Sequence, residues 1–184
     1  MSLSLLAKRL RLPLGFLLAI LYLAFARPTL RGLMLGGGLA LAGVLVRAWA
    51  SGHIMKNDRL ATTGPYAHTR NPLYFGSFLI SCGFALAAHW LLLILVAVFF
   101  LLIYAPTMAR EKANILGRFP DTYPEFERNV PAFVPRLAPW TGGGPTEGAG
   151  TFSGALYMKH GEWKAALGYL GAMTWLVLRL TGVV

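Results

Sequence analysis

Cysteine is almost absent from this sequence: Cys82 is the sole thiol among 184 residues. One thiol excludes a disulfide framework and a cysteine-based metal site, and we expect Cys82 to be a small packed residue. Nucleotide-binding loop patterns are missing too. No strand-borne G-x-G-x-x-G is present, and no Lys-Ser/Thr follows the glycine-rich stretch 36–43. We therefore predict no metal, and we see no additional phosphate-binding basic cluster that would hold a dinucleotide.

Acidic residues are also scarce, with seven against 17 lysines and arginines, so the formal net charge is +10. Such an excess invites a nucleic-acid function, but the placement of the charge indicates membrane topology instead. With the N-terminus inside and five crossings, only Arg27, Arg31 and Arg179 fall outside. The other 14 of the 17 basic residues and all seven acids then lie on the cytoplasmic side, as the positive-inside rule expects. We predict no nucleic-acid partner.

Apolar residues are what the chain has in abundance: they make up 56% of it, too many for an ordinary soluble domain. Five windows approach the roughly 20 residues that a helix needs to cross a bilayer. They lie at about 12–26, 32–50, 73–88, 90–104 and 165–184. The predicted fold class is all-α: a polytopic helical membrane protein with about five transmembrane helices and a cytoplasmic-face cofactor pocket. The predicted location is the cell (inner) membrane.

Composition divides the chain into four parts. Residues 1–50 form a predicted transmembrane hairpin, 51–140 the catalytic core, 141–162 a flexible Gly/Thr/Pro-rich linker, and 163–184 a C-terminal transmembrane helix. The glycines and alanines of 36–43 favour close helix packing in lipid. We expect Arg47, near the inner interface, to extend its side chain toward water.

The chain is organised around residues 63–76, a polar, ring-rich segment between two apolar runs. Pro65 and Pro72 both push the preceding residue out of helical geometry, which predicts a defined, non-helical turn between them and a helix that starts at Pro72. That helix start, beside Arg70, suits a carboxylate or a phosphate.

A second polar group follows the fourth apolar window. We expect Pro106 to interrupt that helix, and a cytoplasmic helix to follow over 107–119 with Arg110 and Glu111 on it. Five prolines beyond it predict a stiff segment folded over the inner face, at positions 120, 124, 131, 135 and 139. Arg70 for a carboxylate, Glu111 for an amine and tyrosine rings for a cation would together suit a small zwitterion such as S-adenosylmethionine.

Two motifs sharpen this hypothesis. The first comprises Gly64-Pro65-Tyr66 and then Arg70-Asn71-Pro72-Leu73-Tyr74-Phe75-Gly76. The second comprises, without a gap, Glu111, Ile115, Phe119, Tyr123, Phe126, Val130, Pro131 and Pro135. In this order they resemble the G-P-Y…R-H-P-x-Y-x-G and E-E-x-x-L-x-x-x-F-G-x-x-Y-x-x-Y-x-x-x-V-P-x-x-x-P patterns of the isoprenylcysteine carboxyl methyltransferase and phospholipid methyltransferase superfamily. The resemblance covers about residues 47–135.

The resemblance implies an integral membrane methyltransferase that binds S-adenosylmethionine at the membrane surface, without a Rossmann fold. Carried over by position, it implies cofactor contacts from Tyr66, His68, Asn71, Pro72, Tyr74, Glu111 and Ile115. Arg70, Arg110 and Glu111 become the candidate catalytic residues, with both arginines facing the reacting groups. Asn71 replaces the pattern's His, Lys112 replaces its second Glu, and Pro120 replaces its Gly.

The implied acceptor is a lipidic or prenylated small molecule that enters from the membrane lipids and carries a carboxylate, amine or thiol. An amine would need Glu111 or His68 as proton acceptor, whereas a carboxylate needs no base. Other interpretations stay open: a phospholipid N-methyltransferase, a non-catalytic lipid-binding protein, or a relative of membrane sterol reductases. The plainest one makes Arg70 and Arg110 interface residues and the tyrosines a membrane belt. The sequence leaves the oligomeric state open.

Overall fold

The computed structural model describes residues 3–53, 59–142 and 151–183. Every regular element in these ranges is helical, which confirms the predicted all-α class. The elements are α1 (Leu3–Phe25), α2 (Leu30–Ser51), the 3-10 turn η1 (Gly64–Ala67), α3 (Pro72–Ala88), α4 (Leu92–Phe99), the π-helical segment η2 (Phe100–Tyr104), α5 (Ala105–Arg118), α6 (Tyr123–Asn129), α7 (Gly154–His160) and α8 (Trp163–Leu180).

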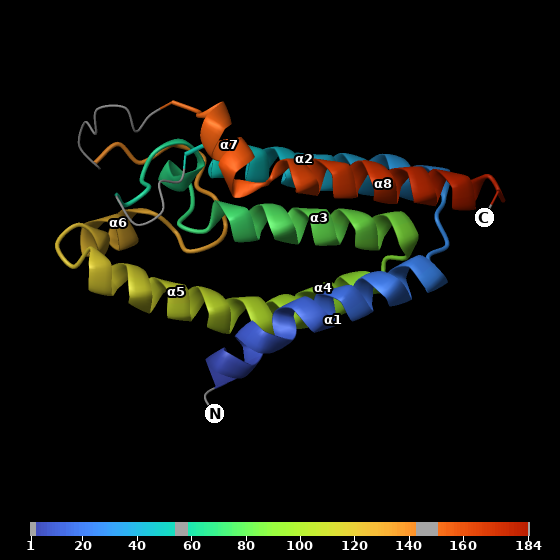
Figure 1. Ribbon diagram of the computed structural model, residues 1–184, viewed down its shortest axis with the longest axis horizontal. Coiled ribbons are helices and arrows are strands. Elements are labelled where there is room, and N and C mark those ends of the chain that lie inside the picture. Colours follow the sequence, from blue (N-terminus) through green and yellow to red (C-terminus); the bar gives the residue numbers. More distant parts are fainter. Residues whose placement is uncertain (1–2, 54–58, 143–150, 184) are drawn as a thin grey trace.

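Five long helical passes correspond to the five apolar windows. Helices α2, α3 and α8 run side by side, and α1 packs against the pass formed by α4, η2 and α5 (Figure 1). Two of these helices, Leu30–Ser51 and the continuous Leu92–Arg118, have the length and apolarity to cross a membrane. Pro13–Phe25 and Pro72–Ala88 are apolar but shorter, and α8 falls outside both groups. Five crossings therefore remain a prediction.

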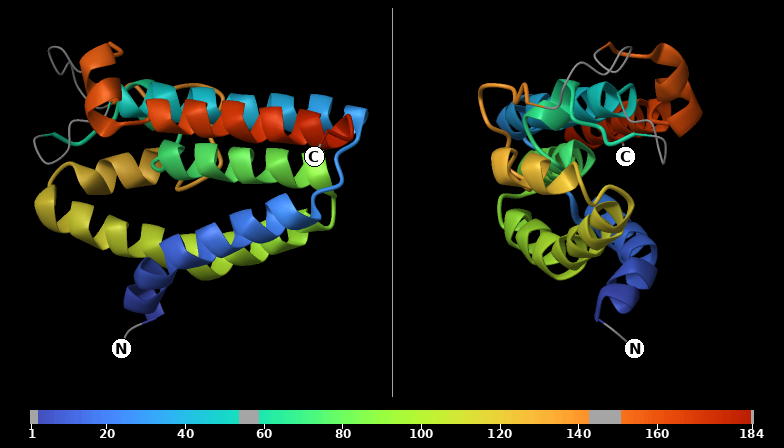
Figure 2. Two further views of the ribbon diagram at one scale, coloured as in Figure 1. Left: turned by 45° about the vertical axis from the view of Figure 1, so that its right-hand side comes forward. Right: turned by 90° about the vertical axis from the view of Figure 1, so that its left-hand side faces the viewer.

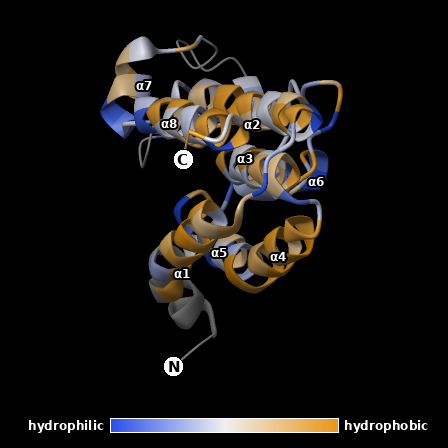
Figure 3. Ribbon diagram, turned by 90° about the vertical axis from the view of Figure 1, so that its right-hand side faces the viewer, coloured by the Kyte–Doolittle hydropathy of each residue, from blue (hydrophilic) through white to orange (hydrophobic). Residues whose placement is uncertain are grey.

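The surface of the bundle is strongly apolar along its helices. Large side chains such as Phe16, Ile20 and Leu101 are each more than 60% exposed. Figure 3 shows this hydrophobic colouring over α1 and α4. The turn 64–71, the segment 119–140 and helix α7 gather at one end of the bundle, whereas the connections before α2 and after α3 lie at the other (Figure 2). The polar turn and the proline-rich segment therefore lie at the same end of the bundle.

Glycines fix the spacing of α2 and α3. A Cβ on Gly36 or Gly83 would lie within 2.6 Å of backbone atoms of the facing helix. A Cβ on Gly43 would likewise lie 2.5 Å from the Gly76 carbonyl oxygen. These positions admit only a hydrogen, so the two backbones are in direct contact. The packing role predicted for the 36–43 stretch is confirmed at Gly36 and Gly43, whereas Gly38 has open space around it.

The predicted interruption at Pro106 is wrong. The helix continues from Leu92 to Arg118, and the five residues Phe100–Tyr104 just before the proline form a π-helical segment. Proline lacks an N–H and its ring crowds the carbonyl one turn earlier, so a local widening of the helix accommodates it without a break. Thr107 donates its hydroxyl to the Ile103 carbonyl inside the same turn.

The predicted linker contains ordered structure. Residues 143–150 lie outside the described residues, but Gly154–His160 forms α7, whose start is capped by the Ser153 hydroxyl. Two bonds join this region to the end of α2: Ser153 N–H donates to the Gly52 carbonyl at 3.0 Å, and the His160 ring pairs with the Ser51 carbonyl at 2.9 Å. We did not predict this helix because the glycine-rich residues before it dominate the composition of the linker.

Candidate functional site

The turn before α3 is held in one conformation by its neighbours. Residues 64–67 form a single 3-10 turn rather than the non-helical turn that we expected. Gly64 has a φ of +58°, and a side chain there would strike the His53 ring 2.5 Å away. Helix α3 begins at Pro72, as predicted, because the missing N–H of a proline costs nothing at this position.

The proline-rich segment is paired with this turn residue by residue. Six hydrogen bonds of 2.8–2.9 Å join residues 67–71 to 131–140. Their partners are Trp140 N–H to the Ala67 carbonyl, Arg136 N–H to the His68 carbonyl, the His68 ring Nδ1 with the Arg136 carbonyl, the Thr69 hydroxyl to the Phe133 carbonyl, Arg70 N–H to the Pro131 carbonyl, and the Asn71 amide to the Ala132 carbonyl. The segment does fold back over this turn, whereas its place at the inner face of a membrane stays a prediction.

These bonds give His68 and Asn71 a structural role. His68 has committed Nδ1, and Asn71 has committed its amide nitrogen, so each has one polar side-chain atom left for a ligand: His68 Nε2 and Asn71 Oδ1. Pro72 is fully buried at the helix start. Ile115 packs against the core of Tyr123, Phe126 and Val130. Their predicted cofactor contacts are untested.

Arg70 reaches from the turn to α6. Its Nη1 donates to the Tyr123 hydroxyl at 2.9 Å and to Glu127 Oε1 at 2.7 Å. Lys112 Nζ lies 2.6 Å from the same oxygen, and these two cations hold the pKa of Glu127 below its ordinary value of 4.5, with the Lys112 hydrogen bond as the largest cause. Lys112, the charge reversal in the second motif, is therefore matched by Glu127.

A hydrogen bond joins the two motifs. The Tyr74 hydroxyl, on the first turn of α3, donates to Glu111 Oε1 on α5 at 2.7 Å. The Tyr104 ring lies edge-on to Tyr74 with centroids 5.3 Å apart, and Glu111 itself is exposed to solvent. The structure thus brings together Tyr74 and Glu111, which are 37 positions apart in the sequence.

Among the residues that the structure describes, two arginine nitrogens at this end are buried without a hydrogen-bond partner: Arg70 Nε and Arg110 Nη1. A buried guanidinium N–H without an acceptor is costly, so these atoms are suited to an anion such as a carboxylate. Tyr66 is also buried, and its pKa is raised above the usual 10.0 by burial, by Glu162 and by Glu111. The phenol stays protonated and can donate.

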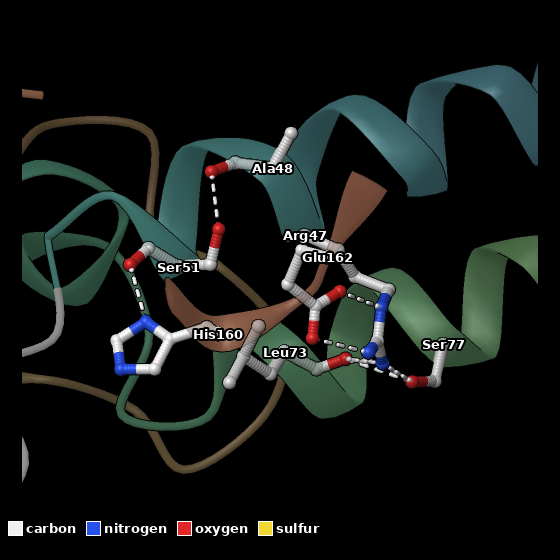
Figure 4. A network of polar contacts seen from close by, with 7 residues as sticks. All are labelled: Arg47, Ala48, Ser51, Leu73, Ser77, His160 and Glu162. Carbon is white, nitrogen blue, oxygen red and sulfur yellow. Dashed lines mark hydrogen bonds and ion pairs between the residues drawn. The ribbon is translucent and has the colours of Figure 1, made fainter. Parts of the chain in front are cut away.

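Sequence reasoning missed a third polar connection. Arg47 is not an extended interface residue: it forms a two-pronged ion pair with Glu162, at the start of α8, with Nε–Oε2 at 2.9 Å and Nη2–Oε1 at 2.8 Å (Figure 4). Its Nη1 also donates to Ser77. The scarcity of acidic residues could have indicated this pair. A largely buried arginine needs a carboxylate partner, and the sequence contains few carboxylates that could provide one.

The predicted site residues all lie in a segment of the chain that matches a known family model. The phospholipid methyltransferase family model matches residues 34–119, from the first half of α2 to the end of α5. No solved structure matches the chain. In the part of the chain that the structure describes, no group of three His, Cys, Asp or Glu side chains is placed to hold a metal ion.

Three curated relatives share part of the sequence. The cobalt-zinc-cadmium resistance protein CzcN of Cupriavidus metallidurans is 35% identical over 59% of this chain and 50% of its own length. The nickel-cobalt-cadmium resistance protein NccN of Alcaligenes xylosoxydans xylosoxydans is 37% identical over 57% and 49%. The protein-S-isoprenylcysteine O-methyltransferase of Schizosaccharomyces pombe is 26% identical over 70% and 56%.

The chain spans about half the length of these relatives. The family match nevertheless contains Gly64 to Gly76 of the first motif and Glu111 to Phe119 of the second, together with the Tyr74–Glu111 bond that joins them. The resemblance drawn from the two motifs is therefore confirmed: residues 34–119 of this chain resemble the phospholipid methyltransferase family, which includes isoprenylcysteine methyltransferase-like proteins.

Proposed function

We propose that this protein is an integral membrane enzyme that transfers a methyl group from S-adenosylmethionine to a lipidic or prenylated acceptor at the membrane surface. The observation that carries the proposal is the 2.7 Å bond between Tyr74 and Glu111, which joins both motifs of a methyltransferase family at one end of the bundle. The proposed orientation puts this end, with its many basic residues, at the cytoplasmic face.

The residues present fit the charges of S-adenosylmethionine. Arg70 Nε and Arg110 Nη1 are buried donors that have no partner in the described part of the chain, and they suit a carboxylate. Glu111 uses Oε1 for Tyr74, which leaves Oε2 for an ammonium group. The Tyr74 and Tyr104 rings present aromatic surface to a cation. When bound, the cofactor supplies a methyl group that its sulfonium has already activated.

The chain's own task is then to bind, orient and exclude water. The six bonds between 67–71 and 131–140 fix the turn that carries Tyr66 and Arg70, so these side chains are placed before any ligand arrives. A carboxylate acceptor would be held by Arg70 or Arg110 and needs no base. An amine acceptor would give its proton to Glu111 or His68.

The apolar part of an acceptor has a matching environment. Phe133 of the folded-over segment lies between α3 and η2, with ring centroids 5.5 Å from Phe78 and 6.3 Å from Phe100. Phe100 in turn stacks on Tyr104 at 4.3 Å. Tyr104 contacts the ring of Tyr74, which bonds to Glu111, so this aromatic group connects the polar end to the apolar helices. It therefore favours an amphiphilic acceptor whose reacting group stays at the polar end.

Transfer of a labelled methyl group tests the proposal. Purified protein in lipid nanodiscs is incubated with methyl-labelled S-adenosylmethionine and a total membrane lipid extract, and label in the organic phase is counted. We expect transfer by the wild type and a loss of about 10- to 100-fold in Arg70→Ala and Glu111→Ala, the range for one lost charged hydrogen bond.

Glu125→Ala is the matched control for these variants. It removes an exposed carboxylate at the same end of the bundle, outside the proposed site, so it should transfer label as the wild type does. Unchanged transfer in the folded Arg70→Ala and Glu111→Ala variants would contradict the site. A labelled product identified as a phospholipid amine would favour the N-methyltransferase alternative.

A further inference from the structure

The ion pair between Arg47 and Glu162 joins the family segment to a helix outside it. Arg47 lies in the last turns of α2, within the matched residues 34–119, whereas Glu162 precedes α8. The two side chains are only 24% and 13% exposed. Both carboxylate oxygens are engaged by separate guanidinium nitrogens, a geometry that fixes orientation as well as charge (Figure 4).

The remaining arginine nitrogen holds the start of α3. Arg47 Nη1 donates to the Ser77 hydroxyl and, at 3.4 Å, to the Leu73 carbonyl, and Ser77 donates to that same carbonyl at 2.9 Å. The arginine stem crosses the backbone at Gly76, where a Cβ would lie 2.7 Å from its Cγ. Leu73 directly precedes Tyr74. Glu162 is thus connected through one guanidinium to the turn that presents Tyr74 to Glu111.

The charges of both carboxylates bear on Tyr66. Burial is the largest cause that raises the pKa of its phenol; Glu162 and then Glu111 raise it further, and Arg47 lowers it. The carboxylate from outside the family segment and the carboxylate of the second motif therefore act on the same tyrosine. Glu162 contributes to the electrostatics of the site as well as to the attachment of α8.

Helix α8 is also attached elsewhere, at places remote from the site. The Tyr169 hydroxyl donates to the Gly37 carbonyl at 3.2 Å. Near the far end, Arg179 donates to the Ala26 and Ala24 carbonyls at 2.9 and 3.2 Å. Because Arg179 and Glu162 both hold the same helix, a variant at Arg179 separates attachment of α8 from any effect on the site.

We propose that Glu162 is a positioning residue: through Arg47 it sets the first turn of α3, so that the C-terminal helix completes the cofactor site. This inference rests on the proposed binding of S-adenosylmethionine. It predicts that neutralising Glu162 weakens cofactor binding in protein that remains folded.

The test is calorimetric titration of the protein in nanodiscs with S-adenosylmethionine, which gives the Kd. The Tm of the same samples is measured in parallel. We expect Glu162→Gln to raise the Kd on the order of tenfold. Glu162→Asp, which keeps the charge, should recover part of the loss. Arg179→Gln should lower Tm and leave the Kd at the wild-type value.

A second variant guards against simple misfolding. Arg47→Gln combined with Glu162→Gln leaves no unpaired charge, so it should retain the fold even if the single change unfolds the protein. The double variant should also bind about tenfold more weakly. A wild-type Kd in either folded variant would overturn the inference while leaving the proposed function intact. Absence of binding by the wild type would overturn both.

Discussion

Replacing Gly83 by alanine tests the contact on which the α2–α3 pair depends. The new Cβ would strike the Ala40 backbone nitrogen and would lie 2.5 Å from the Gly36 carbonyl oxygen and 2.7 Å from the Ala40 Cβ. Ordinary van der Waals contact starts at 3.4 Å, so the helices must separate by about 1 Å along this stretch. All three obstructing atoms belong to the facing helix's backbone or are a Cβ, so no side-chain rotation relieves the clash.

Overpacking of this kind costs about 2 kcal/mol, which corresponds to a fall in Tm of about 4–8 °C for a chain of this size. The assay is the fraction of monodisperse protein that survives a temperature series, measured by size-exclusion chromatography in detergent. Gly38→Ala is the matched control: nothing lies within 4 Å of its Cβ, and alanine favours helix. Equal Tm values for Gly83→Ala and Gly38→Ala would refute the close packing.

Three further predictions concern the polar end. Lys112→Glu should lower Tm and weaken cofactor binding in titration, because it places a carboxylate against Glu127. Adding Glu127→Gln should restore the Tm and the binding. A double variant that recovers neither would contradict the pairing of Lys112 with Glu127. Since the pKa of Glu127 is depressed in the folded protein, its stabilising contribution is complete above 4.5 and is lost as the pH falls below that value. Wild-type Tm should therefore fall more steeply on acidification than that of Glu127→Gln, and equal slopes would refute this. Thr69→Val leaves the Phe133 carbonyl unpaired, which costs about 1–2 kcal/mol, and should speed hydrogen exchange over 131–140; unchanged exchange would argue against the pairing.

Local rules predicted much of the fold. Pro72 set the start of α3 because few positions accept proline as well as a first helical turn does. Glycine at 36 and 43 predicted close packing because small residues are the means by which helices approach in lipid. Pro106 shows the limit: the same rule that ends helices predicted a break, but the helix absorbs the proline in a π-helical segment. Tertiary packing, which the sequence does not display, decided between the two.

The sequence identified which residues belong to the candidate site better than it predicted the contacts that they make. The motifs identified Tyr74 and Glu111, and the structure places them in contact. The motifs did not predict that Asn71 would bond to the proline-rich segment, because that contact depends on how a later segment returns to the turn. The Arg47–Glu162 pair, 115 positions apart, likewise has no local signature. Long-range polar partners become evident only when the helices are placed.

Calorimetric titration of the purified wild-type protein with S-adenosylmethionine and, separately, with a reduced dinucleotide tests the central claim most directly. The charges gathered around Glu111, with the unpartnered nitrogens of Arg70 and Arg110, predict saturable binding of S-adenosylmethionine alone. Binding of the dinucleotide alone, or of neither compound, would contradict the claim.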